Sequence, residues 1–293
     1  MLDSNESLAE LTKEDTGIDF LPINNAQPKR LTPKQIVSFN DQGYISPLPA
    51  LSVDETQWHR DYFDRLLDNL ADFRDSRDAY SIMNYHDQCK GIWQLAQHPV
   101  ILDYVEDLIG PDIVCWTSHY FCKLPSDPKP VAWHQDATYW PIRPTRTVTV
   151  WLAIDDVDIS NSPMEFISGS HTLGAIEYQK ASDNAVLAQE IPDASTYGTP
   201  YANILPAGSM SIHTSTLIHG SKPNQSDSKR RCGLTLRYIP PTCGVLPYAI
   251  SSLHRGIVCR GNGFPWGHIP EPAGEDLSPK PWHRKQVNAK NSK

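Results

Sequence analysis

His134 and Asp136 stand two positions apart in the stretch Val-Ala-Trp-His-Gln-Asp-Ala-Thr-Tyr-Trp-Pro that spans residues 131–141. On an extended chain, residues i and i+2 point to the same face, so this imidazole and this carboxylate can hold one cation from one side. They are two members of the two-histidine, one-carboxylate set that leaves coordination positions open on Fe(II). Because a chain with 11 histidines produces such pairs by chance, the metal hypothesis depends on a third ligand and a co-substrate site downstream.

Two histidines in residues 207–224 are candidates for the third ligand. This stretch is typical of a strand that follows a glycine turn and precedes a Gly/Pro/Asn turn, and His219 lies at its far end. A ligand there can face the first pair across the mouth of a β-barrel. His213 lies six residues earlier, on what we expect to be the same strand and therefore the same face. Spacing alone leaves both histidines open.

Arg230 and Arg231 follow on the next predicted strand. A ferrous ion with three protein ligands needs a chelating organic acid to complete its shell. An arginine on the neighbouring strand can bind the distal carboxylate of that acid with two hydrogen bonds. Strand alternation allows only one of two adjacent arginines to point inward.

The elements expected to position these residues begin with helices. Thr32 and Pro33 are typical of a helix start and Gly43 of a helix end. Residues 52–75 carry apolar side chains at helical spacing, and a further helix from about 91 to 109 is expected to break at the His98-Pro99 step.

From residue 112 onward the pattern changes to short runs rich in Val, Ile, Thr and aromatic residues, separated by turn residues. The runs cover 112–124, 146–155, 163–167, 203–205, 209–218 and 231–240, which is typical of an antiparallel all-β domain. Helices followed by strands predict a mainly β fold, a double-sheeted barrel with flanking helices against one sheet. We expect a flexible leader over residues 1–30 and a single domain over 31–285. Its core spans about 112–240, and capping loops over 241–285 include a possible lid at 262–268.

Composition narrows the class of protein. A net charge of −8 disfavours a nucleic-acid partner, and no apolar run approaches the roughly 18–20 residues of a membrane span. The acidic, polar N-terminus lacks the features of a signal peptide, so the six cysteines are predicted to be free thiols in a cytoplasmic protein. We expect a small-molecule substrate and a monomer or homodimer.

Several motifs, taken in order, resemble the phytanoyl-CoA dioxygenase (PhyH) type of Fe(II)/2-oxoglutarate oxygenases, whose fold is a double-stranded β-helix, or jelly roll. The resemblance covers most of residues 31–240. Its motifs are the 32–43 helix followed by Tyr44, His134-Gln-Asp136, Val150-Trp-Leu-Ala-Ile-Asp-Asp156, Ile167-Ser-Gly-Ser-His171, and His219-Gly-Ser-Lys-Pro-Asn224 with an arginine eleven positions after the histidine.

The resemblance implies a role for individual residues. His134, Asp136 and His219 become the iron ligands, with His213 as a pocket or core histidine. For 2-oxoglutarate, Arg230 would bind the C5 carboxylate in preference to Arg231, assisted by Ser221 and with Trp151 lining the pocket; Lys123 is a further candidate contact. The implied cofactors are Fe(II), 2-oxoglutarate and O2. Because Asp136 retains the carboxylate that related halogenases lack, hydroxylation with release of succinate and CO2 is expected.

The substrate is less defined by the sequence. Candidate contacts follow the ligand pair or lie on segments that the resemblance places near the pocket mouth: Tyr139, Trp140, Arg143, Arg146, Tyr120 and Asn84. The arginines of 143–146 are equally typical of a solvated surface loop. A ring of cationic and aromatic side chains favours a small polar substrate such as an amino acid or a 2-aminoethylphosphonate-like compound. The alternatives are an acyl-CoA 2-hydroxylase and a non-catalytic metal-binding cupin.

Overall fold

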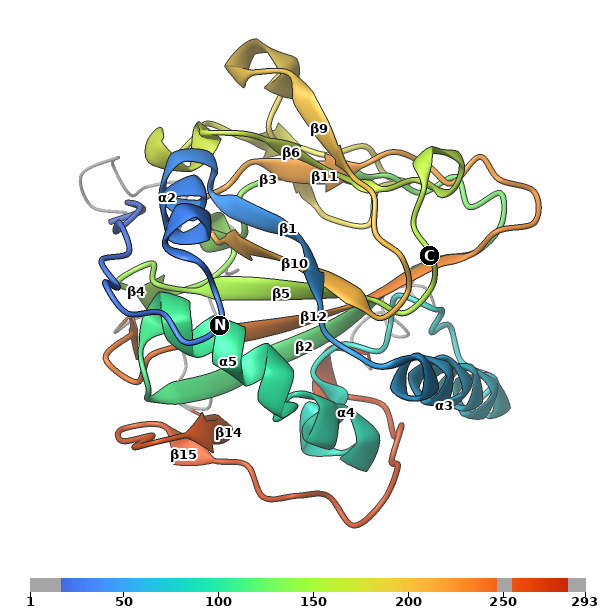
Figure 1. The fold of residues 1–293 in the computed structure, drawn as a ribbon. Helices are drawn as coiled ribbons and strands as arrows, with labels where there is room; N and C mark the ends of the chain where they lie inside the picture. Colours follow the sequence, from blue (N-terminus) through green and yellow to red (C-terminus); the bar gives the residue numbers. More distant parts are fainter. Residues whose placement is uncertain (1–16, 247–254, 284–293) are drawn as a thin grey trace.

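The computed structural model describes residues 17–246 and 255–283, and within them two β-sheets face each other (Figure 1). The larger sheet has the order β1-β10-β5-β12-β2-β14-β15. Its strands are β1 (Tyr44–Pro49), β2 (Ile113–Lys123), β5 (Val148–Ala153), β10 (Ser209–Thr214), β12 (Arg231–Ile239), β14 (Arg255–Arg260) and β15 (Gly267–His268). All neighbours in it pair antiparallel except β14 and β15.

The smaller sheet has the order β3-β11-β6-β9. Its strands are β3 (Val131–His134), β6 (Met164–Ile167), β9 (Pro200–Asn203) and β11 (His219–Ser221). Two short antiparallel pairs lie outside both sheets, β4 (Ile142–Arg143) with β13 (Gly244–Val245) and β7 (Gln179–Lys180) with β8 (Gln189–Glu190). Because the chain passes repeatedly from one sheet to the other, the architecture is the double-stranded β-helix, and the predicted fold class is confirmed.

Within residues 17–246 and 255–283, four α-helices precede the barrel strands or flank them: α2 (Pro33–Gln42), α3 (Val53–Asp72), α4 (Lys90–Leu95) and α5 (Pro99–Ile109). The α2 helix starts with a capping box between Thr32 and Gln35 and ends at Gly43, whose φ of 84° is left-handed. The predicted break at His98-Pro99 separates α4 from α5. These helix predictions are confirmed to within a few residues.

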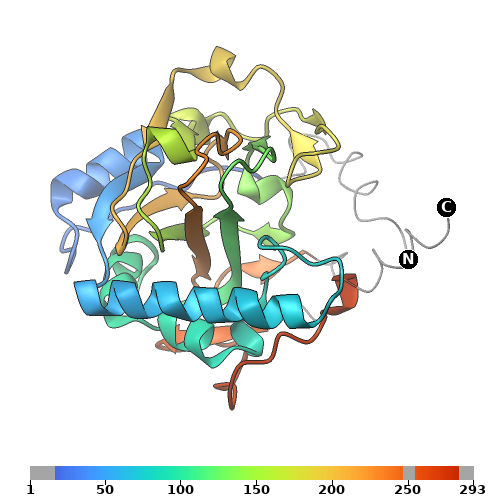
Figure 2. The same cartoon turned by 90° about the vertical axis from the view of Figure 1, so that its right-hand side faces the viewer.

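The long helix α3 crosses the outer side of the larger sheet, together with α4 and α5 (Figures 1 and 2). The main hydrophobic core lies at this boundary. Its fully buried members include Phe63 of α3, Val105 of α5, and Leu152 and Leu234 of the sheet. A smaller apolar cluster around Trp151 and Phe166 fills part of the space between the two sheets. The remaining space between the sheets contains the polar residues described below.

One predicted strand is divided in two. The run 209–218 forms β10 in the larger sheet, and after residues 215–218 the chain enters β11 in the smaller sheet. His213 and His219 therefore lie on opposite sheets, and the prediction that they share one strand and one face is wrong. The expected alternation fails because the chain changes sheet between them.

The two ends of the described chain also differ from expectation. The flexible leader predicted for residues 1–30 is corrected for 17–30, because the backbone amides of Lys29, Arg30 and Leu31 all donate to the Asp107 carboxylate at 2.7–2.8 Å. Residues 1–16 lie outside the described residues. In the possible lid 262–268, Trp266 is buried and donates to the carbonyl of Cys243 at 2.8 Å.

No helix in the described residues is both long and apolar enough to cross a membrane. All six cysteines, which fall within the described ranges, are free, so the prediction of unpaired thiols is confirmed.

Candidate metal centre

His134 is the last residue of β3, and Asp136 begins a short 3-10 helix, Asp136–Thr138. The residue between them, Gln135, is fully buried on the opposite side, where its amide donates to the carbonyls of Gly174 and Thr216 and its oxygen accepts from the amide of Ile176. These three hydrogen bonds hold the turn, so the imidazole and the carboxylate on either side of Gln135 are directed into the barrel.

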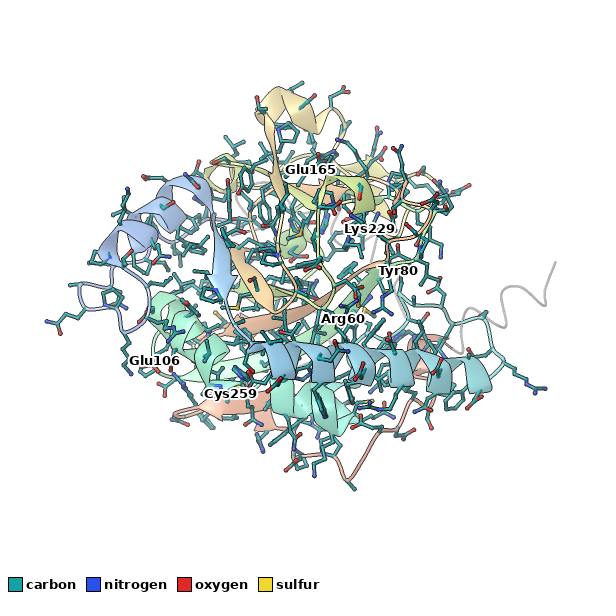
Figure 3. All side chains as sticks on the ribbon, turned by 45° about the vertical axis from the view of Figure 1, so that its right-hand side comes forward. Arg60, Tyr80, Glu106, Glu165, Lys229 and Cys259 are labelled. Atoms are coloured by element: carbon teal, nitrogen blue, oxygen red, sulfur yellow. The ribbon has the colours of Figure 1, made fainter. Side chains whose placement is uncertain are left out.

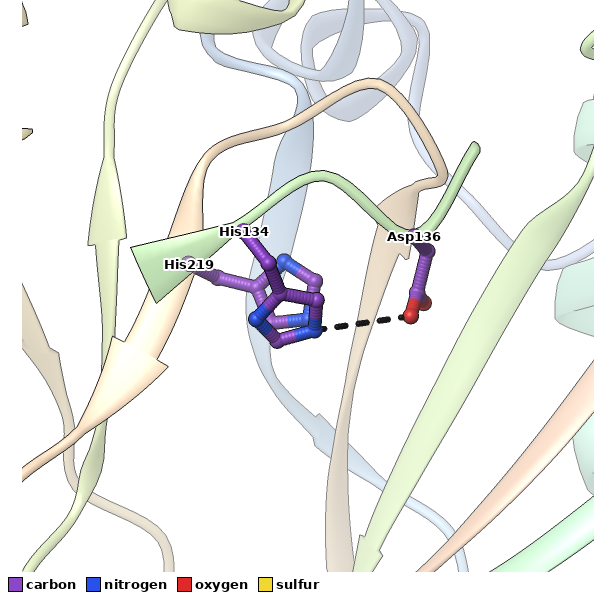
Figure 4. A group of neighbouring side chains, drawn as sticks. All are labelled: His134, Asp136 and His219. Atoms are coloured by element: carbon purple, nitrogen blue, oxygen red, sulfur yellow. Dashed lines mark ion pairs between the residues drawn. The ribbon is translucent and has the colours of Figure 1, made fainter. Parts of the chain in front are cut away.

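His219 starts β11, which pairs antiparallel with β3 so that His219 lies directly opposite His134. The rings of these two histidines are 4.1 Å apart between centroids. Potential ligand atoms of His134, Asp136 and His219 all lie within 4.8 Å of one another, and the three residues are buried. Figure 4 shows the two imidazoles and the carboxylate converging, with Nε2 of His134 at 3.6 Å from Oδ1 of Asp136.

The tautomers of both histidines are fixed by the backbone. Nδ1 of His134 lies 2.7 Å from the carbonyl oxygen of Ala132, and Nδ1 of His219 lies 3.0 Å from that of Leu217. A carbonyl can only accept, so each Nδ1 carries the proton and each Nε2 keeps its lone pair for a metal. Burial and the neighbouring histidines hold the pKa of His219 well below its ordinary value, which keeps that imidazole neutral and able to bind.

Asp136 is ionised although it is buried. Burial alone would raise the pKa of this carboxyl group, but the Arg237 guanidinium and the two neighbouring ligand histidines hold it well below its usual range. Nη2 of Arg237 lies 3.7 Å from Oδ1, and the hydroxyl of Thr149 donates to Oδ2 at 3.2 Å. Two imidazoles held through Nδ1 by backbone carbonyls and an oriented carboxylate are a donor set that fits a divalent first-row metal ion.

His213 faces this group from β10 on the other sheet. Its Nε2 is 3.9 Å from Oδ2 of Asp136, and its ring is 4.6 Å from the His219 ring between centroids. Neither of its ring nitrogens has a hydrogen-bond partner in the described structure, although the side chain is buried. Burial lowers the pKa of His213 to about 4. It is therefore a neutral pocket histidine beside the three-residue group, which does not include it.

A small, partly open cavity lies at these residues. The larger sheet contributes residues of β2, β5, β10 and β12 to its wall, and the smaller sheet contributes residues of β3, β6 and β11. The lining residues outside the three-residue group are Phe121, Val131, Thr149, Trp151, Met164, His213, Gly220, Ser221, Arg231, Thr235 and Arg237.

Arg231, and not Arg230, lies in this cavity. Strand β12 begins at Arg231, whose fully buried guanidinium donates to the carbonyl of Ser162 and to the hydroxyl of Ser221, both at 2.9 Å. It also lies over the Trp151 ring at 5.6 Å. Ser221 and Trp151, both predicted to be near 2-oxoglutarate, therefore surround the same guanidinium.

Arg230 points to the outside of the sheet, so its assignment to the co-substrate is corrected. Its guanidinium forms two hydrogen bonds to Asp155, at 2.7 and 3.0 Å, and an ion pair with Asp64 of α3. Together with Arg60 and Lys229, both labelled in Figure 3, these residues line a surface groove beside the middle of α3. The arginine eleven positions after His219 is Arg230, but the alternation of side chains along β12 directs Arg231 into the cavity instead.

Lys123 is buried beside the cavity but does not line it. It lies opposite Arg231 in the β2–β12 pairing, and its amine donates to the carbonyl of Lys129 at 2.7 Å and to that of Lys222. Burial and the positive charge of Arg231 lower the pKa of Lys123 to about 6. The predicted contact of Lys123 with 2-oxoglutarate is corrected to a supporting position behind the arginine.

None of the six predicted substrate residues lines the cavity. Two of them contact its walls: the Tyr139 ring lies edge-on to His134 at 5.9 Å between centroids, and the Trp140 ring lies under the Arg237 guanidinium at 4.8 Å. Asn84 accepts a hydrogen bond from Thr117, which pairs with Arg237 across the sheet.

The other three predictions are not supported by the structure. Tyr120 is on the outer face of β2, where its ring packs on Phe63 at 4.6 Å between centroids. Arg143 donates to the backbone carbonyls of Trp140 and Ile142. Arg146 lies near Cys243: burial raises the pKa of the Cys243 thiol, and the charge of Arg146 partly offsets that rise. Alternation on β2 identifies Tyr120 as outward-facing, because Phe121 lines the cavity.

The sequence analysis missed Arg237 and Thr149. A signal for Arg237 was present: it lies six residues after Arg231 on one strand, so the two arginines share a face. Thr149 lies on the inner face of β5 next to Arg237, and two residues before Trp151. No short motif marks either residue.

Residues 39–232 match the family model described as phytanoyl-CoA dioxygenase (PhyH). The chain belongs to the phytanoyl-CoA dioxygenase family. The resemblance deduced from the sequence is thereby confirmed, and the match contains the three-residue group and Arg231 within its bounds.

Two curated relatives are an alpha-ketoglutarate-dependent hypophosphite dioxygenase from Stutzerimonas stutzeri, named as probable, and an L-proline trans-4-hydroxylase from Streptomyces griseoviridis. They are 25% identical over 51% of this chain and 26% identical over 52%, respectively. The matched parts span 54% and 64% of the relatives themselves, so the chain aligns with somewhat more than half of each. Among solved structures, the apo form of the non-heme monooxygenase ThoJ shares the fold, with a TM-score of 0.69 and 24% identity over 87% of this chain and 93% of that one.

Proposed function

We propose that the chain is an Fe(II)- and 2-oxoglutarate-dependent dioxygenase that hydroxylates an unactivated C–H bond of a small polar substrate. The observation that carries the proposal is the arrangement of two backbone-fixed imidazoles and an ionised carboxylate at one end of a cavity that also contains the Arg231 guanidinium. Family membership and the relative named as alpha-ketoglutarate-dependent support the same activity.

His134, Asp136 and His219 would hold the iron through Nε2, a carboxylate oxygen and Nε2. When bound, iron with 2-oxoglutarate and O2 supplies oxidative decarboxylation of the co-substrate to succinate and CO2, coupled to hydroxylation of the substrate C–H bond. A facial three-residue set leaves the remaining positions of the metal to the co-substrate and O2.

The protein itself contributes position and a dry site. Arg231 would bind the distal carboxylate of 2-oxoglutarate, since its guanidinium is already oriented by the Ser162 carbonyl and Ser221. Trp151 covers one face of that guanidinium, and the missing side chain of Gly233 leaves the room for its indole. A Cβ built on Gly233 would stand 2.1 Å from the ring. The burial of all three ligand residues keeps water from the reacting centre.

A small polar substrate is favoured over an acyl-CoA ester. The cavity beside the metal ligands is small. Its wall combines aromatic, hydroxyl and cationic side chains. The L-proline hydroxylase among the relatives supports an amino acid, and the hypophosphite dioxygenase supports a phosphorus compound. The alternative, an acyl-CoA 2-hydroxylase, is supported by the family model and by relatives named phytanoyl-CoA dioxygenase, peroxisomal, from Bos taurus, Mus musculus and Homo sapiens, which are 25–27% identical over 45–57% of this chain.

The activity is tested by adding Fe(II) and then 2-oxoglutarate to the protein without oxygen. A visible metal-to-ligand charge-transfer band is expected in the wild type and absent in His134→Ala. Lys180→Ala, which changes an exposed residue of β7, serves as the matched control and should retain the band. A screen of amino acids and small phosphonates for succinate release then identifies the substrate.

If the wild type binds neither Fe(II) nor 2-oxoglutarate, the dioxygenase proposal fails and a non-catalytic metal-binding protein becomes the better account. If the band forms but succinate is released only with acyl-CoA esters, the activity stands and the small-substrate proposal fails.

A further inference from the structure

Arg237 is a second buried guanidinium on the inner face of β12, six residues from Arg231. The two arginines lie on one strand face and both line the cavity of the metal centre. Arg231 is directed towards Ser221, whereas Arg237 is directed towards Asp136. The proposed 2-oxoglutarate clamp therefore has a counterpart on the side of the metal ligands, beside Asp136.

The hydrogen-bonding capacity of Arg237 is largely unused by the described residues. The guanidinium has five N–H donors, but its nearest acceptor there is Oδ1 of Asp136 at 3.7 Å, beyond hydrogen-bond distance. Its Nε is buried without a partner. The Trp140 ring covers one face at 4.8 Å. A buried cation with unpaired donors is costly unless a ligand supplies acceptors.

The charges in the cavity point to the sign of that ligand. Asp136 is the one acidic residue among the lining residues, and it is shared between the metal ligands and Arg237. With a divalent ion and 2-oxoglutarate bound, the positive charges are those of the ion, Arg231 and Arg237, and the negative charges are those of Asp136 and the two carboxylates of 2-oxoglutarate. The site then carries a net charge of +1.

We infer that Arg237 binds an acidic group of the substrate, a carboxylate or a phosphonate, and so selects anionic substrates. This inference rests on the proposed dioxygenase function. The surroundings suit such a group: Arg237 lies between Thr149 and Thr117 in the sheet, and Trp140 packs on its face. An acid held there lies next to Asp136, which brings the rest of the molecule within reach of the metal position.

Binding calorimetry tests the inference without turnover. The protein is loaded with Ni(II), which does not support the reaction, and with 2-oxoglutarate. It is then titrated with propanoate, methylphosphonate and L-proline, each compared with a partner in which the acid is masked: propanamide, dimethyl methylphosphonate and L-prolinamide. At least one acid should bind about tenfold to a hundredfold more tightly than its masked partner, as charge-assisted hydrogen bonds imply.

The variants separate Arg237 from its neighbours. With Ni(II) and 2-oxoglutarate at concentrations that saturate each variant, Arg237→Gln should abolish the preference for the acid and Arg237→Lys should retain part of it. Saturation is required because Arg237 also supports the metal ligand Asp136, and such supporting residues contribute to metal affinity. Arg146→Gln, on the segment that follows the ligand pair, is the matched control and should keep the full preference. Thermal denaturation of each variant confirms that it is folded.

Three results would overturn the inference. The first is the absence of any preference for an acid in the wild type, whether the masked partners bind equally well or nothing binds. The second is an Arg237→Gln variant that keeps the full preference for the acid when saturated with Ni(II) and 2-oxoglutarate, or that cannot be saturated with them at all, which would reduce Arg237 to a positioning residue for Asp136. The third is loss of the preference in Arg146→Gln instead. Failure of the wild type to bind Ni(II) and 2-oxoglutarate would, in contrast, contradict the dioxygenase function itself, and the inference with it.

Discussion

The two faces of strand β12 bury different chemistry. The outer face carries Cys232, Leu234, Leu236 and Tyr238, which pack in the main hydrophobic core beneath the helices. The inner face carries polar side chains at alternate positions, and both of its arginines line the cavity. Both faces are buried, but the side chains of the outer face find all of their contacts within the protein. The inner face leaves donors without partners, as at Nε of Arg237, and so is built for ligands.

The largest effect is expected from replacing a metal ligand inside the barrel. His219→Ala removes one of three metal ligands and should weaken binding of Co(II) or Ni(II) by more than about a hundredfold, since even supporting residues are worth tenfold to a hundredfold. Calorimetry at neutral pH measures it. His213→Ala should weaken metal binding far less. If His213→Ala abolishes binding and His219→Ala does not, the ligand set is wrong.

Leu234→Ala tests the outer face. Leu234 is fully buried between the sheet and the helices, so truncation should lower the free energy of unfolding by about 2–5 kcal/mol. Its inner-face neighbour provides the comparison: Thr235→Ala loses one hydrogen bond, to the His119 carbonyl, at a cost of about 1 kcal/mol. Denaturant titration measures both. The Leu234→Ala protein that remains folded should bind metal normally, and a loss of metal affinity equal to that of His219→Ala would argue against separate roles.

The smallest effect is a dependence of stability on pH. Because the pKa of Lys123 falls from 10.5 in the unfolded chain to about 6 in the folded protein, the unfolded chain holds an extra proton between these values. The contribution of Lys123 to stability therefore rises with pH across that window. Lys123→Met removes it, so the wild type should gain stability relative to the variant from pH 6.5 to 8.5, with a limiting slope of about 1.4 kcal/mol per pH unit. Parallel stability curves would show that Lys123 keeps its proton in the folded protein.

The sequence was most informative where a local rule decides the structure. The capping residues of α2, the break before α5 and the convergence of His134 with Asp136 all follow from spacing and residue type. The family resemblance extended this to His219, because the order of the motifs identified the fold.

The sequence was least informative where the role of a residue depends on the exact position at which a strand begins. Arg230 and Arg231 differ by one residue, and the start of β12 decides which of them enters the cavity. The chain changes sheet between His213 and His219 within residues 215–218, and the alternation of apolar and polar residues along a strand does not reveal this change. Arg237 was overlooked because its partners, Asp136 and Trp140, are distant in sequence.

The most direct test of the central claim, that the inner face of β12 carries the chemistry, compares the two adjacent arginines. 2-Oxoglutarate is titrated without oxygen into Fe(II)-loaded Arg231→Gln and Arg230→Gln, and the charge-transfer band is followed. Arg231→Gln should weaken co-substrate binding about tenfold to a hundredfold, whereas Arg230→Gln should change it by less than about threefold and affect mainly the link between α3 and the sheet. The reverse result, with weak binding in Arg230→Gln and normal binding in Arg231→Gln, would contradict the account.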